Sequence, residues 1–177
     1  MGASKNYSWR KQVLIKTGIG YDVHQLKKGM PLVIGGVLIK SSMGSVGHSD
    51  GDSLIHAICD SLLGASGLGD IGKFFPSDDK KWENAKSKMF LIEVNKMLLQ
   101  AGYYISNIDC TIILQKPRLS SYMDEIKKNI STILNVSNND ISIKATTTDH
   151  LGYIGKSEGW AVIAISTIYR ADGENSH

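Results

Sequence analysis

The segment 47–79, GHSDGDSLIHAICDSLLGASGLGDIGKFFPSDD, gathers acidic and histidine side chains around a stretch with helical periodicity. Its centre, residues 52–63, has the apolar spacing of a helix, for which Ser49 or Asp50 is the expected N-cap and Gly64 the expected end. The glycine-rich stretch that follows is too long and irregular for a simple turn. We therefore expect a helix flanked by two functional loops.

One face of this predicted helix is polar. Asp52, His56 and Asp60 are spaced four apart, so on a helix they form a single stripe. Leu54 and Ile58 belong to the opposite, apolar stripe, which is expected to face a core. A short helix with two acids and a histidine on one face indicates that this face is wet or occupied by a ligand.

Composition limits the classes of protein to consider. The chain has 177 residues, of which 42% are hydrophobic and 21% charged, with a formal net charge of +3. These values are typical of one globular domain. There is no dense Lys/Arg stripe, so nucleic acid is not an expected partner. No apolar run approaches the roughly 20 residues of a membrane span, and the polar, basic N-terminus has no secretory signal pattern.

The periodicity along the chain predicts an α+β fold, with strands and helices in irregular alternation. Residues 1–12 and 171–177 are expected to be tails. The segment 41–47 is expected to be a loop. Strands or hairpins are predicted over 13–24, 31–39, 103–115, 140–148 and 160–169, and further helices over 83–100 and 121–134. Cys59 and Cys110 lie among apolar neighbours, which predicts two buried thiols in a reducing compartment.

Three side chains suggest a metal site. Asp22 and His24 are two apart on a predicted strand, so both project from the same face. His56 comes from the predicted helix. Three nitrogen and oxygen ligands without a cysteine are typical of a catalytic zinc ion with an open fourth position. Alternatives stay open at this point, because an isolated D-x-H is often a surface hydrogen bond and His48 could replace either histidine.

The threonine run 146–148 suggests phosphate binding. It stands at the end of a predicted strand, where hydroxyls and successive backbone N–H groups can cradle phosphate oxygens. Lys156 could add a positive charge, and Asp149 could hold Mg²⁺ or Mn²⁺. Threonine also simply suits strands. Together with the metal candidates, the run favours phosphoryl chemistry.

Four motifs now resemble one family, that of 2-C-methyl-D-erythritol 2,4-cyclodiphosphate synthase. They are G-x-G-Y-D-V-H at 18–24, H-S-D-G-D at 48–52, G-D-I-G-K-F-F-P at 69–76 and K-A-T-T-T at 144–148. The resemblance implies a single catalytic domain over 13–170, built on a mixed β-sheet with helices on one face. It also implies a homotrimer with active sites between adjacent subunits, in a bacterial cytoplasm or, alternatively, a plastid stroma.

The resemblance further implies a reaction. 4-Diphosphocytidyl-2-C-methyl-D-erythritol 2-phosphate is cyclised when its 2-phosphate attacks the β-phosphorus and CMP leaves. The family's zinc ligands match Asp22, His24 and His56, and its ligand for a second ion, Mg²⁺ or Mn²⁺, matches Asp149. His48 and Thr147 match catalytic residues that stabilise the transition state. The substrate-binding positions match Ser49, Asp70, Gly72, Phe75, Asp79, Leu114, Pro117, Arg118, Leu119, Ser120, Thr146, Thr148, Tyr153 and Lys156.

Four of these positions depart from the family pattern. Asp149 stands where the family has Glu, and its carboxylate arm is one methylene shorter. Lys156 replaces an Arg and lacks the planar fork that clasps a phosphate. Arg118 replaces a Lys, and Tyr153 a Phe. The family's threefold cavity can hold a prenyl diphosphate near Tyr153, Lys156 and Glu158. A metal-dependent phosphohydrolase and a module that binds isoprenoid diphosphates are the alternative functions.

Overall fold

The structure is a computed structural model. It describes residues 13–47, 49–76, 79, 82 and 85–171. The predicted N-terminal tail, residues 172–177 of the predicted C-terminal tail and the catalytic candidate His48 lie outside the described residues.

A five-stranded mixed sheet forms the centre of the fold, with strand order β4-β1-β7-β5-β6. Neighbouring strands are antiparallel except β5 and β6, which are parallel. A separate two-stranded hairpin, β2–β3, lies at one end. The strands are β1 (Val13–Lys28), β2 (Leu32–Ile34), β3 (Val37–Ile39), β4 (Met43–Val46), β5 (Tyr104–Ile113), β6 (Ile141–Thr146) and β7 (Gly159–Ala171).

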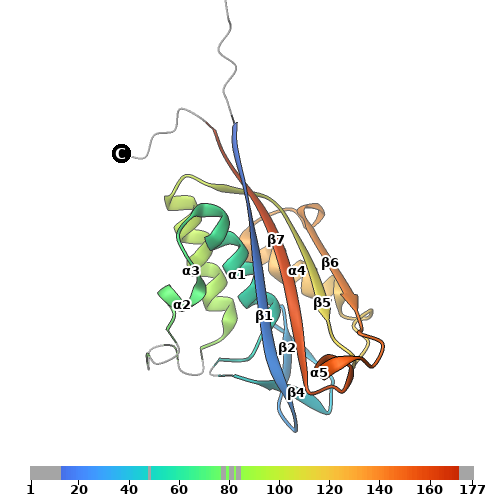
Figure 1. Ribbon diagram of the computed structural model, residues 1–177. Coiled ribbons are helices and arrows are strands. Elements are labelled where there is room, and N and C mark those ends of the chain that lie inside the picture. Colours follow the sequence, from blue (N-terminus) through green and yellow to red (C-terminus); the bar gives the residue numbers. More distant parts are fainter. Residues whose placement is uncertain (1–12, 48, 77–78, 80–81, 83–84, 172–177) are drawn as a thin grey trace, which may run out of the picture.

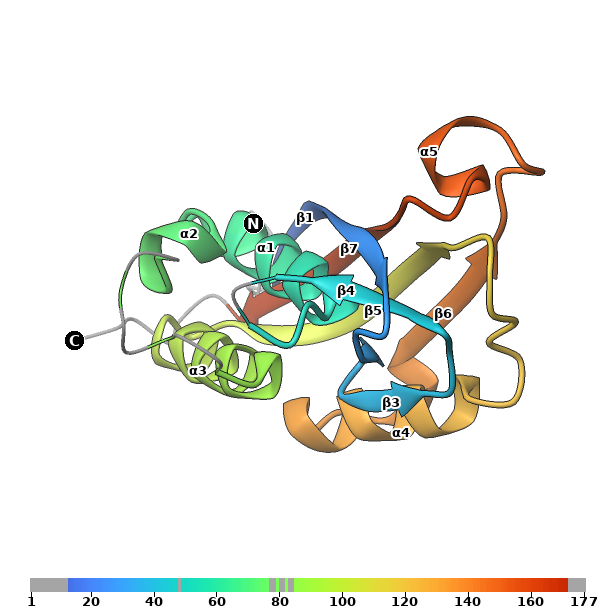
Figure 2. The same ribbon diagram turned by 90° about the horizontal axis from the view of Figure 1, so that it is seen from below.

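The three long helices pack on one face of this sheet (Figures 1 and 2). The first, α1, lies across β1 and β7, α3 packs against α1, and α4 packs against β6 and β3. The predicted α+β fold with helices on one face of a mixed sheet is therefore confirmed. The helices are α1 (Ser53–Ser66), α2 (Ile71–Phe74), α3 (Ser87–Gln100), α4 (Met123–Leu134) and α5 (Gly152–Gly155), with a 3₁₀ turn over Asn138–Asp140.

Two glycines of β1 allow α1 to lie unusually close to the sheet. A Cβ atom on Gly18 would come within 2.1 Å of the Ser61 carbonyl oxygen, and one on Gly20 within 1.9 Å of the Ala57 carbonyl oxygen. Real Cβ atoms do not approach backbone atoms so closely, so any larger residue would push the helix away. The G-x-G before Asp22 thus sets the distance between β1 and α1.

The core lies between the sheet and the helices. The apolar stripe predicted on α1 is buried there, since Leu54, Ile58 and Leu62 have no exposed surface. Trp160 of β7 is also fully buried, and its indole N–H donates to the Ser45 hydroxyl at 3.0 Å. Both cysteines are buried free thiols, as predicted.

In the part of the chain that the structure describes, no long helix packs on the other face of the sheet, and the centre of that face is apolar. Along β1 the side chains of Ile19, Tyr21 and Val23 are 68%, 54% and 46% exposed. Ile163 and Ile165 of β7 lie beside them in the register and are also exposed. We call these five residues the open-face patch. A contiguous apolar patch of this kind marks an interaction surface.

Some local predictions were wrong. The expected loop 41–47 contains β4, which pairs with the far end of β1 although the segment is rich in glycine and serine. Short helices, α2 and α5, interrupt the two glycine-rich stretches. Helix α1 is capped by Asp52 and not by Ser49 or Asp50. Among the described residues, no helix combines the length and the hydropathy that crossing a bilayer requires.

Candidate active site

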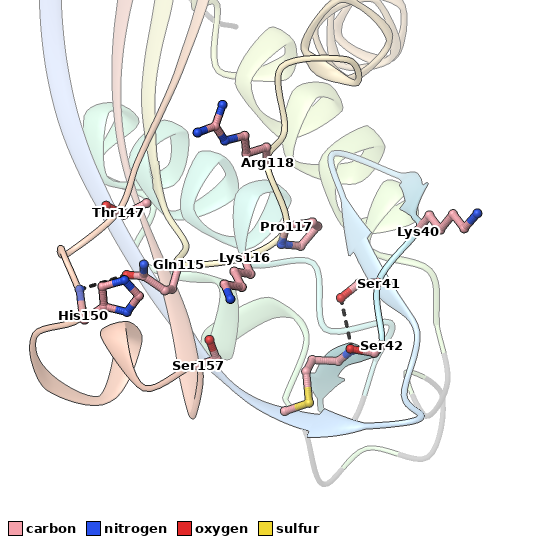
Figure 3. Close-up of a pocket in the computed structure, with 11 residues that line it drawn as sticks. Lys40, Ser41, Ser42, Gln115, Lys116, Pro117, Arg118, Thr147, His150 and Ser157 are labelled. Carbon is pink, nitrogen blue, oxygen red and sulfur yellow. Dashed lines mark hydrogen bonds between the residues drawn. The ribbon is translucent and has the colours of Figure 1, made fainter.

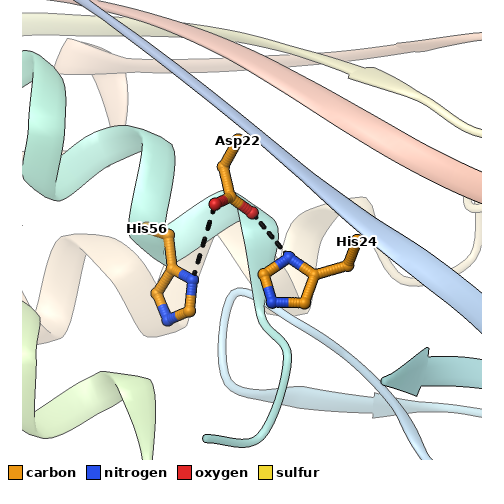
Figure 4. A group of neighbouring side chains, drawn as sticks. All are labelled: Asp22, His24 and His56. Carbon is orange, nitrogen blue, oxygen red and sulfur yellow. Dashed lines mark hydrogen bonds and ion pairs between the residues drawn. The ribbon is translucent and has the colours of Figure 1, made fainter. Parts of the chain in front are cut away.

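Asp22, His24 and His56 meet at one point, as Figure 4 shows. Asp22 and His24 project from the same face of β1, and His56 comes from the first turns of α1. One carboxylate oxygen of Asp22 lies 2.7 Å from Nδ1 of His24, and the other lies 3.8 Å from Nδ1 of His56. One ligand atom from each residue lies within 4.8 Å of the others. The predicted three-residue cluster is therefore present, and we call it the Asp–His–His cluster.

The start of α1 is fixed by Asp52, a fully buried carboxylate. It accepts three backbone N–H bonds: from Ile55 at 3.1 Å in its own helix, and from Gly35 and Gly36 at 3.0 and 2.6 Å in the β2–β3 turn. Burial raises the pKa of this carboxyl to about 6, although those N–H groups oppose the shift. Asp52 is thus occupied in holding the helix that carries His56.

The polar stripe predicted on α1 does not act as one ligand-facing surface. Asp52 is a cap, and Asp60 accepts the backbone N–H of Ile71 at 2.8 Å, which fixes the start of α2. Burial raises the pKa of the Asp60 carboxyl. Only His56 of the three belongs to the Asp–His–His cluster. The three residues do lie on one face of α1, as their spacing predicts. However, the carboxylates of Asp52 and Asp60 accept backbone N–H groups, including ones from distant segments, and are not directed at a ligand.

The electrostatics of the cluster favour a cation. Burial by itself raises the pKa of the Asp22 carboxyl, but hydrogen bonds to His24, His56 and Ser53 outweigh it, so the pKa lies well below its usual range. Burial lowers the pKa of the His56 imidazole, but the nearby carboxylates of Asp22, Asp52 and Asp50 outweigh it and raise the pKa above its usual value. Excess negative charge therefore gathers around the imidazoles.

The donor set suits zinc. Ligands about 2.1 Å from a tetrahedral ion are about 3.4 Å from one another. The 3.8 Å between Asp22 and His56 is close to this separation, and the Asp22–His24 pair is a little tighter at 2.7 Å. One carboxylate and two imidazoles also leave the fourth position to a substrate oxygen, as in catalytic zinc sites.

An aromatic wall borders the cluster. Phe90 of α3 lies 6.0 Å from the His56 ring, and Phe75 stacks on Phe90 at 4.8 Å between ring centroids. Trp82 meets Phe75 edge-on at 5.0 Å. Together with Ser49 and the two histidines, these rings line a cavity of about 170 Å³. Ser49 and Phe75, both predicted to bind substrate, therefore lie beside the cluster.

Several predicted substrate-binding residues line two cavities other than the one beside the cluster. A space of about 720 Å³ is bordered by Lys40, Gln115, Lys116, Arg118 and Thr147 (Figure 3). A second space of about 360 Å³ shares Gln115, Pro117, Arg118 and Thr147 with it. Its remaining wall includes the predicted residues Leu114, Leu119, Ser120 and Thr146. We call these two spaces the basic cavities, since Arg118 borders both and Lys40 and Lys116 border the larger one.

The loop after β6 carries further predicted residues. Asp149 adopts a left-handed conformation with φ of 49°, and its carboxylate accepts the Thr147 hydroxyl at 3.2 Å. The Thr148 hydroxyl donates to the Leu151 carbonyl at 2.7 Å. The Tyr153 hydroxyl lies 3.4 Å from that of Tyr21 at the open-face patch.

The remaining predicted positions lie on the short helices. Asp70 caps α2 by accepting the Lys73 N–H at 2.9 Å, and Gly72 is part of that helix. Asp79 is exposed, and its backbone N–H donates to the Pro76 carbonyl. Lys156 is exposed at the end of α5.

The two groups of predicted residues are separated within the chain. In the sheet register, Asp22 is level with Val162 of β7, Ile112 of β5 and Ala145 of β6. Three strand spacings, about 14 Å, therefore separate β1 from β6. Thr146 and Ala145 both line the smaller basic cavity, together with Met123 of α4. Among the described residues, none lines both the cavity beside the cluster and a basic cavity.

Two serines were missed at the sequence level. The Ser53 hydroxyl lies 2.9 Å from Nδ1 of His24, and the Ser87 hydroxyl lies 3.0 Å from Nε2 of His56. Both serines are fully buried. No motif marks them, because serine is common at the first turn of a helix whatever it contacts.

The comparisons with known proteins agree with this geometry. The model of the YgbB family matches residues 15–169. A 2-C-methyl-D-erythritol 2,4-cyclodiphosphate synthase of Clostridium botulinum is 51% identical over 151 residues, which cover 85% of this chain and 97% of that protein. This chain belongs to the 2-C-methyl-D-erythritol 2,4-cyclodiphosphate synthase family.

Solved structures of family members share the fold. The chain matches the bifunctional IspDF of Campylobacter jejuni with a TM-score of 0.87 and 39% identity over 90% of its length. It spans 43% of that longer protein. It also matches IspF of Plasmodium falciparum in complex with CDP, with a TM-score of 0.78 and 36% identity, covering 88% of this chain and 96% of that one.

Proposed function

We propose that this chain converts 4-diphosphocytidyl-2-C-methyl-D-erythritol 2-phosphate to 2-C-methyl-D-erythritol 2,4-cyclodiphosphate and CMP, with zinc held by Asp22, His24 and His56. The observation that carries the proposal is the convergence of these three side chains in a chain that is 51% identical to curated enzymes of this activity. A bound zinc ion would supply Lewis acidity to a phosphate oxygen.

The chain's own residues then position the substrate. The Asp22 carboxylate lies 2.7 Å from Nδ1 of His24 and 3.8 Å from Nδ1 of His56, so both rings are directed at one point. The aromatic wall of Phe75, Trp82 and Phe90 keeps bulk water from one side of the cluster. Shielding of this kind strengthens electrostatic interactions within a site.

The basic cavities are suited to the cytidine diphosphate portion of the substrate. Lys40, Lys116 and Arg118 offer positive charge, and Thr147 offers a hydroxyl to the diphosphate. A CDP complex is known for the Plasmodium falciparum family member. In the proposed site, Asp149 holds the second divalent ion, Mg²⁺ or Mn²⁺, which would screen the repulsion between the two phosphates.

We further propose that each active site forms between two copies of the chain, in a homotrimer. Asp22 of the Asp–His–His cluster, on β1, and Thr146 on β6 lie about 14 Å apart across the strands, and among the described residues their cavities share no lining residue. In this proposal, the substrate bridges the Asp–His–His cluster of one chain and the basic cavities of the next. The open-face patch, with Ile19 at 68% exposure, offers an apolar surface for the contact between copies.

A prenyl diphosphate in a cavity on the threefold axis is a second proposed ligand. Tyr153 is 44% exposed beside the open-face patch, and Lys156 lies three residues further along the same loop. An aromatic face and an ammonium group suit an isoprenoid chain and its diphosphate, respectively.

The test is an assay with the cytidylyl substrate in ¹⁸O-labelled water. We expect CMP and an unlabelled cyclic diphosphate in equal amounts, and no turnover after zinc has been removed with a chelator. A linear phosphate that carries solvent oxygen would instead establish a metal-dependent phosphohydrolase.

A further inference from the structure

His56 has a second set of polar neighbours on the side of its ring away from Asp22. Its Nδ1 faces Asp22, and its Nε2 lies 3.0 Å from the Ser87 hydroxyl. The same hydroxyl donates to a carboxylate oxygen of Asp50, while the other oxygen of Asp50 accepts the Ser87 backbone N–H at 3.0 Å. Ser87 has no exposed surface, and the His56 side chain is 13% exposed. The loop before α1 and the first residue of α3 thus meet at His56.

Proton counting fixes the direction of this chain of bonds. A carboxylate can only accept, so the single hydroxyl proton of Ser87 is used toward Asp50. The Ser87 oxygen is then left as an acceptor for His56, and Nε2 must carry the ring proton. In a neutral imidazole the other nitrogen is then unprotonated. That nitrogen, Nδ1, is the one that faces Asp22.

We propose that Ser87 is a positioning residue for the metal ligand His56, and that Asp50 sets the direction in which the Ser87 hydroxyl donates. The pair selects the tautomer whose Nδ1 lone pair is directed into the Asp–His–His cluster, and it holds the ring at that angle. The inference rests on the proposed zinc site. Partners that orient a ligating histidine through its second nitrogen affect metal affinity by about 10- to 100-fold.

Two neighbouring contacts do not replace this arrangement. The Ser49 hydroxyl also approaches Nε2 of His56, but at 3.4 Å, the outer limit of a hydrogen bond. Asp50 also caps α3 through the Ser87 N–H, a structural role that needs no side-chain hydroxyl. A test must therefore separate the hydroxyl from the cap.

Two variants make this separation. Ser87→Ala removes the hydroxyl and keeps the backbone N–H on Asp50. Asp50→Asn keeps the shape and the cap, because its amide oxygen still accepts the Ser87 N–H. Its NH₂ group then donates to the Ser87 oxygen, which frees the Ser87 proton for Nε2 of His56 and favours the wrong tautomer. The matched control is Ser61→Ala, which removes another fully buried hydroxyl from α1, one bonded to Ser166 at 2.5 Å.

Zinc affinity is measured by competition with a fluorescent chelator on each metal-free, folded variant, alongside its thermal midpoint. We expect about 10- to 100-fold weaker zinc binding in Ser87→Ala and in Asp50→Asn, and wild-type affinity in Ser61→Ala despite its lower midpoint. Nitrogen-15 spectra of the zinc-loaded wild type should show His56 protonated at Nε2.

Affinity within twofold of wild type in either site variant overturns the inference, as does an equal loss in Ser61→Ala. Should Ser87→Ala not fold, Asp50→Asn decides. If the wild-type protein itself binds no zinc, the proposed function fails and not the role of Ser87.

Discussion

The Asp–His–His cluster and the basic cavities differ in how they are built. The cluster is half-buried, with side chains 13% to 23% exposed, and it joins the long strand β1 to the best-packed helix. The basic cavities are wide and are bordered mainly by loops, where Arg118, Thr147 and His150 are exposed. The Asp–His–His cluster is complete within one chain, whereas the basic cavities open to solvent.

This difference indicates which part of the chemistry depends on folding and which on assembly. Core packing sets the cluster, because Gly18 and Gly20 bring α1 onto β1 and Asp52 fixes the start of that helix. The walls of the basic cavities have no such support on their solvent side. Metal binding should therefore survive changes outside the cluster that lower the rate, and the variants below test this separation.

The largest effect is expected for His56→Ala. Losing one of three ligands should remove most of the zinc and lower the rate of CMP release by about 10³-fold, because a catalytic ion supplies several kcal/mol of charge stabilisation. Zinc content is measured together with CMP release. His150→Ala, the matched control for zinc content, removes an exposed histidine outside the cluster and should keep the metal. Full turnover in His56→Ala without bound metal would show that the cluster is not catalytic.

The second-largest effect is expected when a charge is introduced into the open-face patch. Ile19→Lys is expected to separate the copies and to lower the rate by about 10²-fold or more, because misplacing one half of a site costs about that much. Zinc content should stay at one ion per chain. Sedimentation velocity and metal analysis check both points.

Leu38→Lys is the control for this change. Leu38 is equally exposed at 68%, but it lies on β3 of the separate hairpin and not on the five-stranded sheet. The control variant should leave both assembly and rate unchanged. An Ile19→Lys protein that stays assembled, or that loses its zinc, would contradict the separation of the two regions.

Thr147→Val tests the basic cavities without touching the cluster. The change removes the hydroxyl but keeps the branched shape, and the rate should fall by about 10²-fold, as when one donor to a developing charge is lost. Steady-state kinetics should show the loss in kcat, with zinc content unchanged. A loss confined to KM would mean that Thr147 binds substrate without stabilising the transition state.

The smallest effect is expected for Asp149→Asn. Asparagine tolerates the left-handed backbone at φ of 49°, so the loop should keep its shape. Removing the charge should raise the Mg²⁺ or Mn²⁺ concentration for half-maximal rate by roughly tenfold, since carboxylates are the preferred ligands of hard cations. Titration of each ion measures this. Loss of zinc in this variant would mean that Asp149 has been assigned to the wrong ion site.

The metal cluster could be predicted from the sequence because it depends on short-range rules. The two-residue spacing of Asp22 and His24 places both on one face of a strand, and the family motifs add His56 from the next helix. The α+β fold could be predicted from the same kinds of information, namely the periodicity of the chain and the family motifs. The apolar stripe of α1 also needed only the helical period.

The rest depends on contacts between distant segments. Asp52 and Asp60 matched the stripe, yet the Gly35, Gly36 and Ile71 N–H groups that occupy them cannot be placed without the fold. Ser87 was missed for the same reason, since α3 must dock before its hydroxyl reaches His56. The strand order that places Thr146 three strands from Asp22 is likewise not a local property.

The central claim, that two copies of the chain share each active site, is tested most directly by mixing two inactive variants. His56→Ala damages only the cluster, and Thr147→Val damages only the basic cavities. After equal amounts are unfolded and reassembled together, a trimer with sites between neighbours regains about a quarter of the wild-type sites, because every mixed trimer contains one undamaged pair. CMP release should therefore recover to about a quarter of the wild-type rate. A mixture no more active than the average of its two components would contradict the account and place each site within a single chain.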